Sequence, residues 1–564
     1  MGFAITLVAL LVALALAWRF LGSYLVAVYD GRVRWLSFLE KPLYRVLGVD
    51  PTVEQTWPRY TAALLVFSAV AILITYGLLR LQGHLPLNPQ HLPGVSPALA
   101  WNTSVSFVTN TNWQNYAGET TMSYLSQMSA LTVQMFVSAS VGLAIAVALI
   151  RGFSRRESST IGNFWVDLTR GVIYVLMPIA AVFTVLFVAQ GAIQTLAGPA
   201  HIHDALNGAR QVIPRGPVAS QEVIKQLGTN GGGFFNANGA HPFENPTGLT
   251  NILSVLLLLA IPVALTYVFG RMVGSVRQGL AVLSAMALLF GAWLAFTTTA
   301  EMGRNPAVAA AGLPHQPSGN MEGKETRFGA ASSALYNIAS TQTSTGSVDS
   351  ANDSYTPIGG MGLLTGMMLG EVSPGGVGSG LYTILLFAII AVFIGGLMVG
   401  RTPEYLGKKI QSREVKLAAL GVLVMPIVVV VMTGIAVAVP AGRSAIENHG
   451  PHGFTEILYA FTSQANNNGS AFAGLSANTP FYNIAGGIAM LLGRFAVMIP
   501  VLALAGTLAA KGIVPASAGT FRTDTPLFIG LLVGVILIVG GLTFFPAVAL
   551  GPIAEQLAHG RFYP

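Results

Sequence analysis

Four short clusters rich in Asn, Gly and Thr recur along the chain at a nearly constant interval, each between two long apolar stretches. With Asn110, Gly231, Gly346 and Gly469 as markers, the steps are 121, 115 and 123 residues. A fixed period indicates one structural unit used four times. Four polar loops that meet around an axis inside a membrane can replace the water shell of a cation with backbone carbonyl groups. The repeat therefore predicts an ion pathway built by one polypeptide.

The chain has the composition of a membrane protein. Only 9% of its 564 residues are Asp, Glu, Lys or Arg, against roughly 25% in an ordinary globular protein. A helix needs about 20 mostly apolar residues to cross the hydrocarbon core of a bilayer. Ten such stretches can be placed, at residues 3–28, 60–79, 125–150, 171–196, 249–269, 279–300, 381–400, 417–440, 483–510 and 526–550.

These stretches and the repeat predict an all-α polytopic membrane protein of about ten transmembrane helices, with four pseudo-symmetric helix–pore-loop–helix repeats and an extra N-terminal helix. The apolar region 358–380 is interrupted by nine glycines and one proline, so we expect the second helix of the third repeat to be broken there. The expected division is an N-terminal helix and loop at 1–58, repeats at 59–160, 161–274, 275–412 and 413–515, and a C-terminal helix at 516–564.

A short helical stretch comes before each polar cluster, inside each of the four long connections. Such a half-helix would enter the membrane and stop at the cluster, where the partial negative charge of its carboxyl end favours a cation. Non-helical backbone at this depth must be enclosed by protein or line a wet cavity, so the four loops are expected to meet one another. The four stretches are residues 101–108, 220–227, 332–340 and 454–464.

The positively charged residues lie in alternate loops. The net charge of +7 would suit a nucleic-acid-binding protein, but its lysines and arginines gather in connections between apolar stretches. Because short loops rich in Lys and Arg stay in the cytoplasm, their distribution predicts that the four long connections and both termini face outward. The basic excess therefore orients the protein and indicates no nucleic-acid partner. The main basic groups are at 32–59, 151–156, 271–277, 401–416 and 511–522.

Several kinds of chemistry have no support in the sequence. The chain has no cysteine, which excludes disulfides, thiolate metal sites and cysteine nucleophiles. Its histidines are scattered, and the pair His201 and His203 has no second ligand pair at a spacing typical of zinc sites. We find no nucleophile elbow, phosphorylated-aspartate motif or ATP-binding loop, so no catalytic site is expected. No basic residue precedes the first apolar run, which is expected to remain as an anchor and not to be cleaved.

The glycine-rich cluster at 228–234 is the sharpest motif. Consecutive glycines permit positive φ and allow several carbonyl groups to point toward one axis. The alternative is a flexible turn or a phosphate-binding loop, but the Lys-Ser/Thr that closes a phosphate loop is missing. The clusters at 109–114, 343–347 and 466–470 would each suit an exposed turn or a polar linker on their own. Only their period favours a filter.

Two charged residues lie within apolar stretches. Arg494 is in the ninth, where a charge costs at least about 2.5 kcal/mol and is by default functional. Its guanidinium could form a barrier in the cavity below the filter, or it could serve a structural ion pair or a subunit contact. Glu371 lies in the broken region, which could be a gate or simply a kinked helix, and is a candidate ligand of the ion path. Asp349 and Asp353 follow the third cluster and are expected to be solvated loop residues.

Several long runs of residues resemble the A subunit family of the bacterial Kdp potassium-transporting ATPase. The similarity extends over essentially the whole chain, with the runs in the same order. The runs are Thr-Asn-Thr-Asn-Trp-Gln at 109–114, Gly-Thr-Asn-Gly-Gly-Gly-Phe-Phe-Asn-Ala-Asn at 228–238, Val-Gly-Arg-Thr-Pro-Glu-Tyr-Leu-Gly-Lys-Lys at 399–409 and Asn-Asn-Asn-Gly-Ser-Ala-Phe-Ala-Gly at 466–474.

The resemblance implies a potassium-selective, non-catalytic subunit in the bacterial inner membrane that passes K⁺ from the periplasm through an intramembrane tunnel. It implies a complex with a P-type ATPase subunit (KdpB-like), a C subunit (KdpC-like) and a small F subunit (KdpF-like), with K⁺ as the transported ion. Gln114 and Arg494 match polar positions near the pore. The implied filter residues are Asn110, Thr111, Thr229, Asn230, Gly231, Thr345, Gly346, Asn467, Asn468 and Gly469.

Two other functions fit part of this pattern. A Trk- or Ktr-type K⁺ transporter, driven by the membrane potential and regulated by a cytosolic nucleotide-binding ring, shares the plan of four repeats. The run at 399–409 favours the interpretation as a Kdp-like subunit. An intramembrane enzyme would need paired carboxylates, histidines or metal ligands within the spans, and the sequence does not show them.

Overall fold

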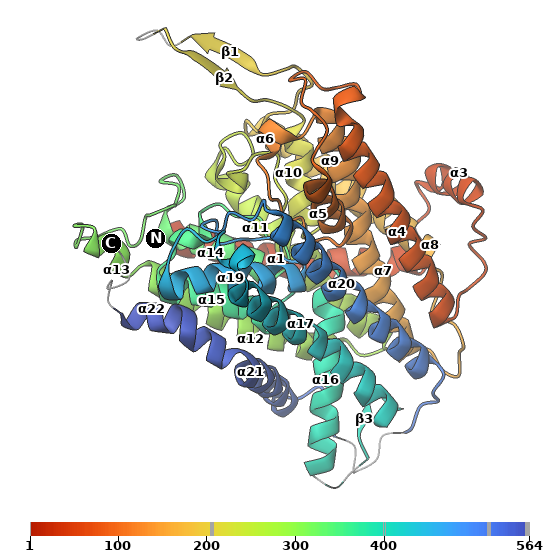
Figure 1. The fold of residues 1–564 in the computed structure, drawn as a ribbon. Helices are drawn as coiled ribbons and strands as arrows, with labels where there is room; N and C mark the ends of the chain where they lie inside the picture. The colour runs from red at the N-terminus through yellow and green to blue at the C-terminus, as the bar shows by residue number, and fades with distance from the viewer. Residues whose placement is uncertain (1, 204–207, 399, 401, 516–520, 559–564) are drawn as a thin grey trace.

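Long helices make up most of the chain. The computed structural model describes residues 2–203, 208–398, 400, 402–515 and 521–558 (Figure 1). Within these residues ten helices are long and apolar enough to cross a membrane, which confirms the expected number. They span Gly2–Tyr29, Trp57–His84, Ser126–Ser154, Phe164–Ala189, Gly248–Met272, Val276–Ala310, Ser379–Met398, Ser412–Ala438, Pro480–Ala509 and Pro526–Leu557.

The starts of several spans have clear local causes. Thr479 accepts a hydrogen bond at its side chain from the backbone N–H of Tyr482, and Pro480 fills the first position of helix α20 (Pro480–Ala509). The same arrangement, a threonine cap followed by proline, starts α21 (Pro526–Val548). A side-chain cap satisfies one of the free N–H groups at a helix start, and proline has no N–H to leave free. These helices therefore begin at positions fixed by the sequence.

In each repeat the second helix lies inside the bundle and the first lies outside. The buried share of the most apolar window is 83%, 78%, 67% and 67% in the second spans of repeats one to four, against 28%, 33%, 39% and 50% in the first spans. The same division in all four repeats supports one shared plan. The inner helices are α7 (Val133–Ser154), α11 (Gly248–Met272), α16 (Ser379–Met398) and α20, and the outer ones are α4 (Trp57–Leu81), α9 (Met177–Ala189), α12 (Val276–Glu301) and α17 (Ser412–Ala438).

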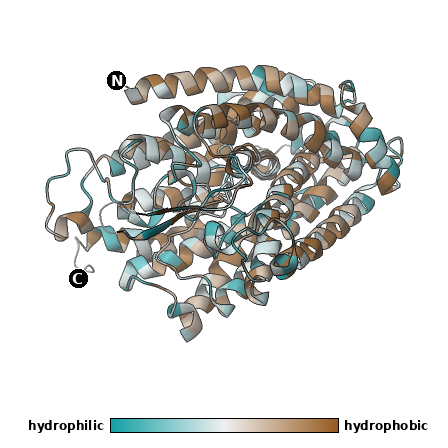
Figure 2. Cartoon of the chain, turned by 90° about the horizontal axis from the view of Figure 1, so that it is seen from above, coloured by the Kyte–Doolittle hydropathy of each residue, from teal (hydrophilic) through white to brown (hydrophobic). Residues whose placement is uncertain are grey.

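Two spans lie outside the four repeats. The first, made of α1 (Gly2–Leu16) and α2 (Gly22–Tyr29), runs along the edge of the bundle in Figure 2, and only 6% of its most apolar window is buried. The last contains α21 and α22 (Ala554–Leu557) and is also peripheral, at 28%. Both therefore expose apolar surface, as expected of helices that contact lipid or another subunit.

The four expected half-helices are present, each directly before its polar cluster. Each is a few residues longer at its start than the sequence predicts. Their sequences are mostly buried, so they lie within the bundle and not on its surface. They are α5 (Pro97–Val108), α10 (Val218–Leu227), α14 (Gly329–Thr341) and α19 (Gly450–Asn466).

The second helix of the third repeat is broken, as expected. A short helix α15 (Pro357–Met368) ends before a turn, and α16 starts only at Ser379. The turn packs with its backbone directly on α7, because a Cβ atom at Gly378 would lie 2.0 Å from the carbonyl oxygen of Gly142. The break therefore requires glycine on both sides of this contact.

Three basic connections meet at one end of the bundle. The Lys408 ammonium is buried and donates to the carbonyl oxygens of Arg155 and Lys511, both at 2.5 Å. Lys408 lies in a small antiparallel hairpin of β3 (Glu404–Tyr405) and β4 (Lys408–Lys409), which belongs to the run at 399–409. Val399 and Arg401 of this run lie outside the described residues.

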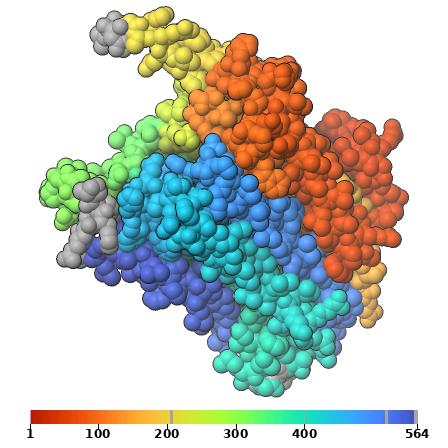
Figure 3. Space-filling view, viewed as in Figure 1, coloured from red at the N-terminus to blue at the C-terminus, as the bar shows by residue number. Residues whose placement is uncertain are grey.

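The other small elements lie at the periphery. A hairpin of β1 (Ala200–His203) and β2 (Arg210–Ile213) projects beyond the helices at the top of Figure 1 and is the protruding arm in Figure 3. The remaining helices are short. Those in the connections are α3 (Ser37–Leu47), α6 (Gly118–Thr121) and α18 (Pro440–Arg443), while α8 (Phe164–Arg170) begins the fourth span and α13 (Pro306–Ala310) ends the sixth.

Candidate functional site

The four polar clusters share one backbone conformation. In each, two residues separated by one position have φ in the left-handed region. The same alternation in four clusters of different sequence defines their alignment, including that of the third cluster. The pairs are Asn110 and Asn112 (φ 69° and 53°), Thr229 and Gly231 (48° and 94°), Ser344 and Gly346 (51° and 83°), and Asn467 and Gly469 (58° and 102°).

The residue between each left-handed pair closes the preceding half-helix. Its backbone N–H donates to a carbonyl oxygen five residues earlier, a bond that caps the last turn of a helix. All four half-helices therefore end in the same way and direct their carboxyl ends at the clusters. The bonds are Thr111 to Ser106 at 2.9 Å, Asn230 to Lys225 at 2.8 Å, Thr345 to Ser340 at 3.1 Å, and Asn468 to Ser463 at 2.8 Å.

The clusters contact one another in a closed ring. A Cβ atom at Gly231 of the second cluster would lie 1.6 Å from the carbonyl oxygen of Thr345 in the third. The corresponding distances are 2.4 Å from Gly346 to the Asn468 oxygen and 2.1 Å from Gly469 to the Thr111 oxygen. Three glycines are thus required because a neighbouring strand's backbone occupies the space a side chain would need. The ring runs in chain order from the first cluster to the fourth and back.

Asparagine side chains hold neighbouring strands of the ring together. The Asn110 amide donates to the carbonyl oxygen of Thr229 at 2.9 Å. The Asn467 amide donates to the Thr111 hydroxyl oxygen, also at 2.9 Å. These bonds join the first strand to the second and the fourth strand to the first. The predicted filter residues are therefore brought together, and their side chains serve to position the backbone.

Gln114 also joins the first and second strands. Its side-chain amide donates to the carbonyl oxygen of Gly233 and accepts from the N–H of the same residue, both at 3.0 Å. The side chain thus imitates a strand partner. Gln114 lies at the mouth of the ring, beside a hollow of about 690 Å³ that is also lined by Gly231, Gly346 and Gly469. These two hydrogen bonds fix the first strand to the second at the filter mouth.

Asn112 is a residue of the ring that the sequence analysis did not single out. It occupies the fourth position of the first cluster, where the other three clusters have glycine, and it lines the same hollow. Its side chain is 2% exposed, and neither its amide nitrogen nor its oxygen has a hydrogen-bond partner among the described residues. Both polar atoms of this side chain are therefore buried without a protein partner among the described residues. The period does not distinguish it from Asn110, and it is the alignment of left-handed positions that identifies it.

A buried charged cluster lies behind the second strand. The Lys225 ammonium contacts the carboxylates of Glu222 and Glu244, and all three side chains are at most 1% exposed. Lys225 also donates to Asn238 at 2.8 Å, and the Asn238 amide donates to the carbonyl oxygen of Gly231 at 2.9 Å. The charge therefore fixes a filter residue through one intermediate side chain. Nothing in the spacing of these residues indicated it.

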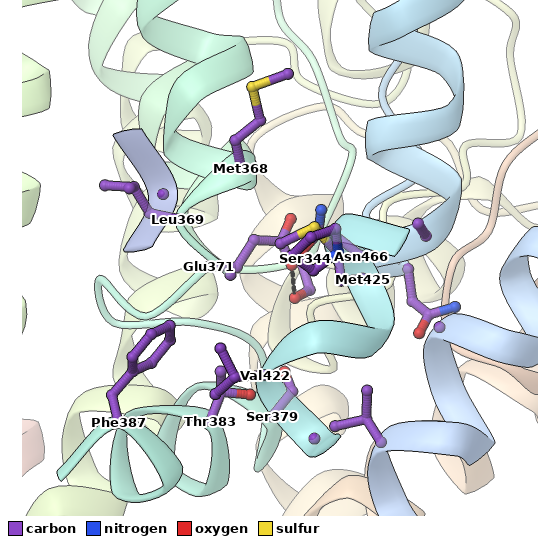
Figure 4. A pocket seen from close by; sticks show the side chains of 18 of the residues that line it. Ser344, Met368, Leu369, Glu371, Ser379, Thr383, Phe387, Val422, Met425 and Asn466 are labelled. Atoms are coloured by element: carbon purple, nitrogen blue, oxygen red, sulfur yellow. Dashed lines mark hydrogen bonds between the residues drawn. The ribbon is translucent and has the colours of Figure 1, made fainter. Parts of the chain in front are cut away.

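A cavity of about 60 Å³ lies against the third and fourth strands (Figure 4). Glu371 projects into it, accepts a hydrogen bond from the Ser344 hydroxyl and accepts another from the Asn468 amide at 2.8 Å. The carboxylate thus holds two neighbouring strands from below. Glu371 is 2% exposed and makes polar contacts with the filter strands, and its role as a ligand of the ion path remains a prediction.

Arg494 lines the same cavity. Its side chain is buried, and one terminal nitrogen donates to the carbonyl oxygen of Ser138 at 3.0 Å. Among the described residues it forms no ion pair, so the structural ion pair considered from the sequence is not present there. A buried guanidinium beside the space below the filter, without a carboxylate partner in the described part of the chain, fits a barrier to cations.

Comparison with known proteins shows the family of this chain. A family model described as the potassium-transporting ATPase A subunit matches residues 7–557. The chain belongs to this family. It is 58% identical over 549 residues to the potassium-transporting ATPase potassium-binding subunit of Mesorhizobium japonicum, with 96% of each chain covered. The protein of the same name from Granulibacter bethesdensis is 58% identical over 544 residues, covering 96% of this chain and 95% of the relative.

A more distant relative gives the same result. The potassium-binding subunit of Herpetosiphon aurantiacus is 55% identical over 553 residues, covering 95% of this chain and 96% of the relative. The similarity to this A subunit family thus includes all four clusters. It supports potassium transport as the general role and a multi-pass membrane protein as the general form.

The expectation for Asp349 in this A-subunit chain is wrong. It was placed in a solvated loop, but it is fully buried next to Ser350, whose hydroxyl lies 3.2 Å from its carboxylate. Burial raises the pKa of Asp349 to about 7. Asp353 is half-buried and contacts His452. The loop after the third cluster folds inward over the filter, which a polar sequence does not reveal.

Proposed function

We propose that the ring of four strands is a K⁺-selective filter that takes the ion from the periplasmic side. The observation that carries this proposal is the repetition of one backbone conformation in four clusters that touch around a common centre. Backbone carbonyl groups arranged in this way can replace the water shell of a monovalent cation. The relatives' name, potassium-binding subunit, supports K⁺ as that cation.

The surroundings of the ring favour a cation in two ways. The carboxyl ends of α5, α10, α14 and α19 all stop at it, and each carries a partial negative charge. Moving a bare ion from water into a medium of low dielectric constant costs roughly tens of kcal/mol if no ligands replace the lost water. The ligands must therefore be in place before the ion arrives. The hydrogen bonds of Asn110, Gln114, Glu371 and Asn467 hold the strands in place. The filter is therefore preorganised.

The ion would leave the filter through the cavity below it. That cavity is lined by residues of α16, α17 and α21 as well as by the filter, and α21 is a peripheral helix. A route that leads sideways toward the edge of the bundle fits delivery within the membrane to a neighbouring subunit. We propose that this neighbour is the P-type ATPase subunit of a complex that also contains C and F subunits, in the bacterial inner membrane.

A partner must provide the energy. Accumulation of K⁺ against a thousandfold gradient takes about 4 kcal/mol per ion, at about 1.4 for each factor of ten. A filter binds the ion but gives its movement no direction. We therefore propose that this chain is a non-catalytic subunit without an ATP site and that ATP is hydrolysed by the P-type subunit.

The proposed function is tested by ATP hydrolysis in the purified complex, titrated with K⁺ and, separately, with Na⁺. Hydrolysis is expected to rise with K⁺ and to show little response to Na⁺ over the same range. Equal stimulation by both ions would contradict selective capture by this chain. A complex that copurifies with a soluble nucleotide-binding ring instead of a P-type ATPase would favour the Trk- or Ktr-type alternative.

Replacement of Arg494 by methionine is expected to increase passive K⁺ flux through the complex. Methionine keeps the length of the side chain and removes the charge beside the cavity. A loss of only about 1.4 kcal/mol from the barrier raises the flux about tenfold. The measurement is ⁸⁶Rb⁺ uptake into proteoliposomes without ATP. Arg494→Lys, which keeps the charge, is the matched control and should remain tight, and a methionine variant with unchanged flux would remove the barrier role.

A further inference from the structure

A cluster of three potential metal ligands lies outside the ring, where the loop after the third strand meets the fourth half-helix. Asp353 belongs to that loop, and His452 and Glu456 lie one turn apart on α19. Each offers a ligand atom, and these atoms all lie within 4.8 Å of one another. Among the described residues this is the only group of three or more His, Asp or Glu side chains that close together. The spacing of residues along the sequence does not reveal this group, because Asp353 and His452 lie 99 positions apart.

The His452 ring is oriented as a metal ligand is. Its Nδ1 lies 2.9 Å from a carboxylate oxygen of Glu555 on α22, and its Nε2 lies 3.2 Å from Asp353. Metal-binding histidines almost always donate their second ring N–H to a carboxylate, a carbonyl oxygen or water. Glu555 is in the position of that acceptor. Nε2 is then directed at the other members of the cluster.

Glu456 gives an independent reason to expect a cation. Its side chain is fully buried, and one oxygen accepts from the Asn448 amide at 2.7 Å. The other oxygen is buried and has no hydrogen-bond partner among the described residues. A buried carboxylate oxygen without a donor is costly, and a bound cation removes that cost. The unsatisfied oxygen belongs to the residue that completes the group of three.

The cluster is covered by the chain that follows the fourth filter strand. A Cβ atom at Gly474 would lie 2.4 Å from a Glu456 oxygen and 3.0 Å from an Asp353 oxygen. Only glycine leaves the two carboxylates free to approach each other here. The side chain of Asp353 is 20% exposed, so an ion can still reach the cluster from one side.

We propose that Asp353, His452 and Glu456 bind one divalent transition-metal ion of the Zn²⁺ or Mn²⁺ class. One imidazole nitrogen and two carboxylates, with a water molecule completing the set, form a ligand set typical of these ions. The ion joins the loop after the third filter strand to the fourth half-helix and, through Glu555, to the C-terminal span. It is a structural ion of the filter mouth and is distinct from the transported K⁺.

The test measures metal retained by the intact purified complex. The complex is treated with a chelator, incubated with Zn²⁺ and freed of excess metal by gel filtration, and zinc is measured by mass spectrometry. The parent is expected to retain one zinc ion more than the Glu456→Gln and His452→Ala variants. A variant with His201 and His203 both replaced by Ala, on the exposed hairpin, is the matched control and should bind as the parent does. Glu555→Gln should weaken binding about 10–100-fold.

The same comparison is made with Mn²⁺, followed by electron paramagnetic resonance. Retention of either metal that is lost in the two variants supports the site. Equal retention of both metals in parent and variants would show that the cluster is only a histidine–carboxylate ion pair. If a variant at Glu456 or His452 assembles poorly, Asp353→Asn supplies the same comparison at the most exposed of the three ligands. Undiminished metal binding in that variant overturns the proposal.

Discussion

Replacement of Gly231 by alanine is expected to abolish K⁺-stimulated ATP hydrolysis by the complex. Gly231 has φ +94°, and an added Cβ would lie 1.6 Å from the Thr345 carbonyl oxygen of the next strand. No rotation of a side chain can relieve that contact because both atoms belong to backbone-defined positions. Either the third strand moves or the second strand leaves the left-handed conformation, and both changes open the ring. The measurement is the K⁺ titration of ATP hydrolysis described above.

Gly274 provides the control for this experiment. It also has a left-handed backbone, φ +80°, but a Cβ there would meet nothing within 4 Å. Alanine at either position destabilises the folded state by about 1–2 kcal/mol because its backbone must stay left-handed. Only Gly231→Ala also places a Cβ atom against the backbone of the neighbouring strand. The Gly274→Ala complex should keep its K⁺ response. If both variants behave like the parent, the strands are not in close contact in the working protein.

The features predicted well from the sequence were those that depend on local patterns. Ten spans follow from apolar length, and the half-helices follow from their place before the clusters. The broken helix follows from the glycines and proline between Gly359 and Gly380. Each of these requires only the residues of one segment. The period added what a single segment cannot supply, since the Ser/Thr-rich third cluster has no filter signature of its own.

The features that were missed depend on partners distant in the chain. The polar sequence around Asp349 predicts a solvated loop. Its burial results from the way that loop folds over the filter. Asn112 follows two residues that were assigned to the filter, and only the alignment of left-handed positions shows that it corresponds to Gly231. The cluster of Asp353 and His452 joins residues 99 positions apart. Burial and pairing of polar groups are tertiary properties, so composition and periodicity do not fix them.

Replacement of Lys225 by methionine is expected to destabilise the chain strongly. Methionine fills a similar volume but leaves the Glu222 and Glu244 carboxylates buried without their cation. Breaking a buried ion pair by removing one partner costs roughly 3–5 kcal/mol. The expected result is a lower midpoint of thermal unfolding and a poor yield of assembled complex. A single variant as stable as the parent would mean that the two carboxylates are solvated or protonated in the working protein.

The matched control replaces all three charges, as Lys225→Met with Glu222→Gln and Glu244→Gln. Well-packed apolar residues in place of a whole buried charged set are often neutral or stabilising, whereas buried glutamine amides still need hydrogen-bond partners. The triple variant removes the uncompensated carboxylates and should therefore recover part of the loss. Its filter should nevertheless be altered. In this variant Asn238 loses the hydrogen bond donated by Lys225, and the Asn238 amide positions the Gly231 carbonyl oxygen. A stable triple variant that needs more K⁺ for half-maximal ATP hydrolysis would separate the two roles of the lysine. Unchanged K⁺ dependence would limit Lys225 to stabilising the fold.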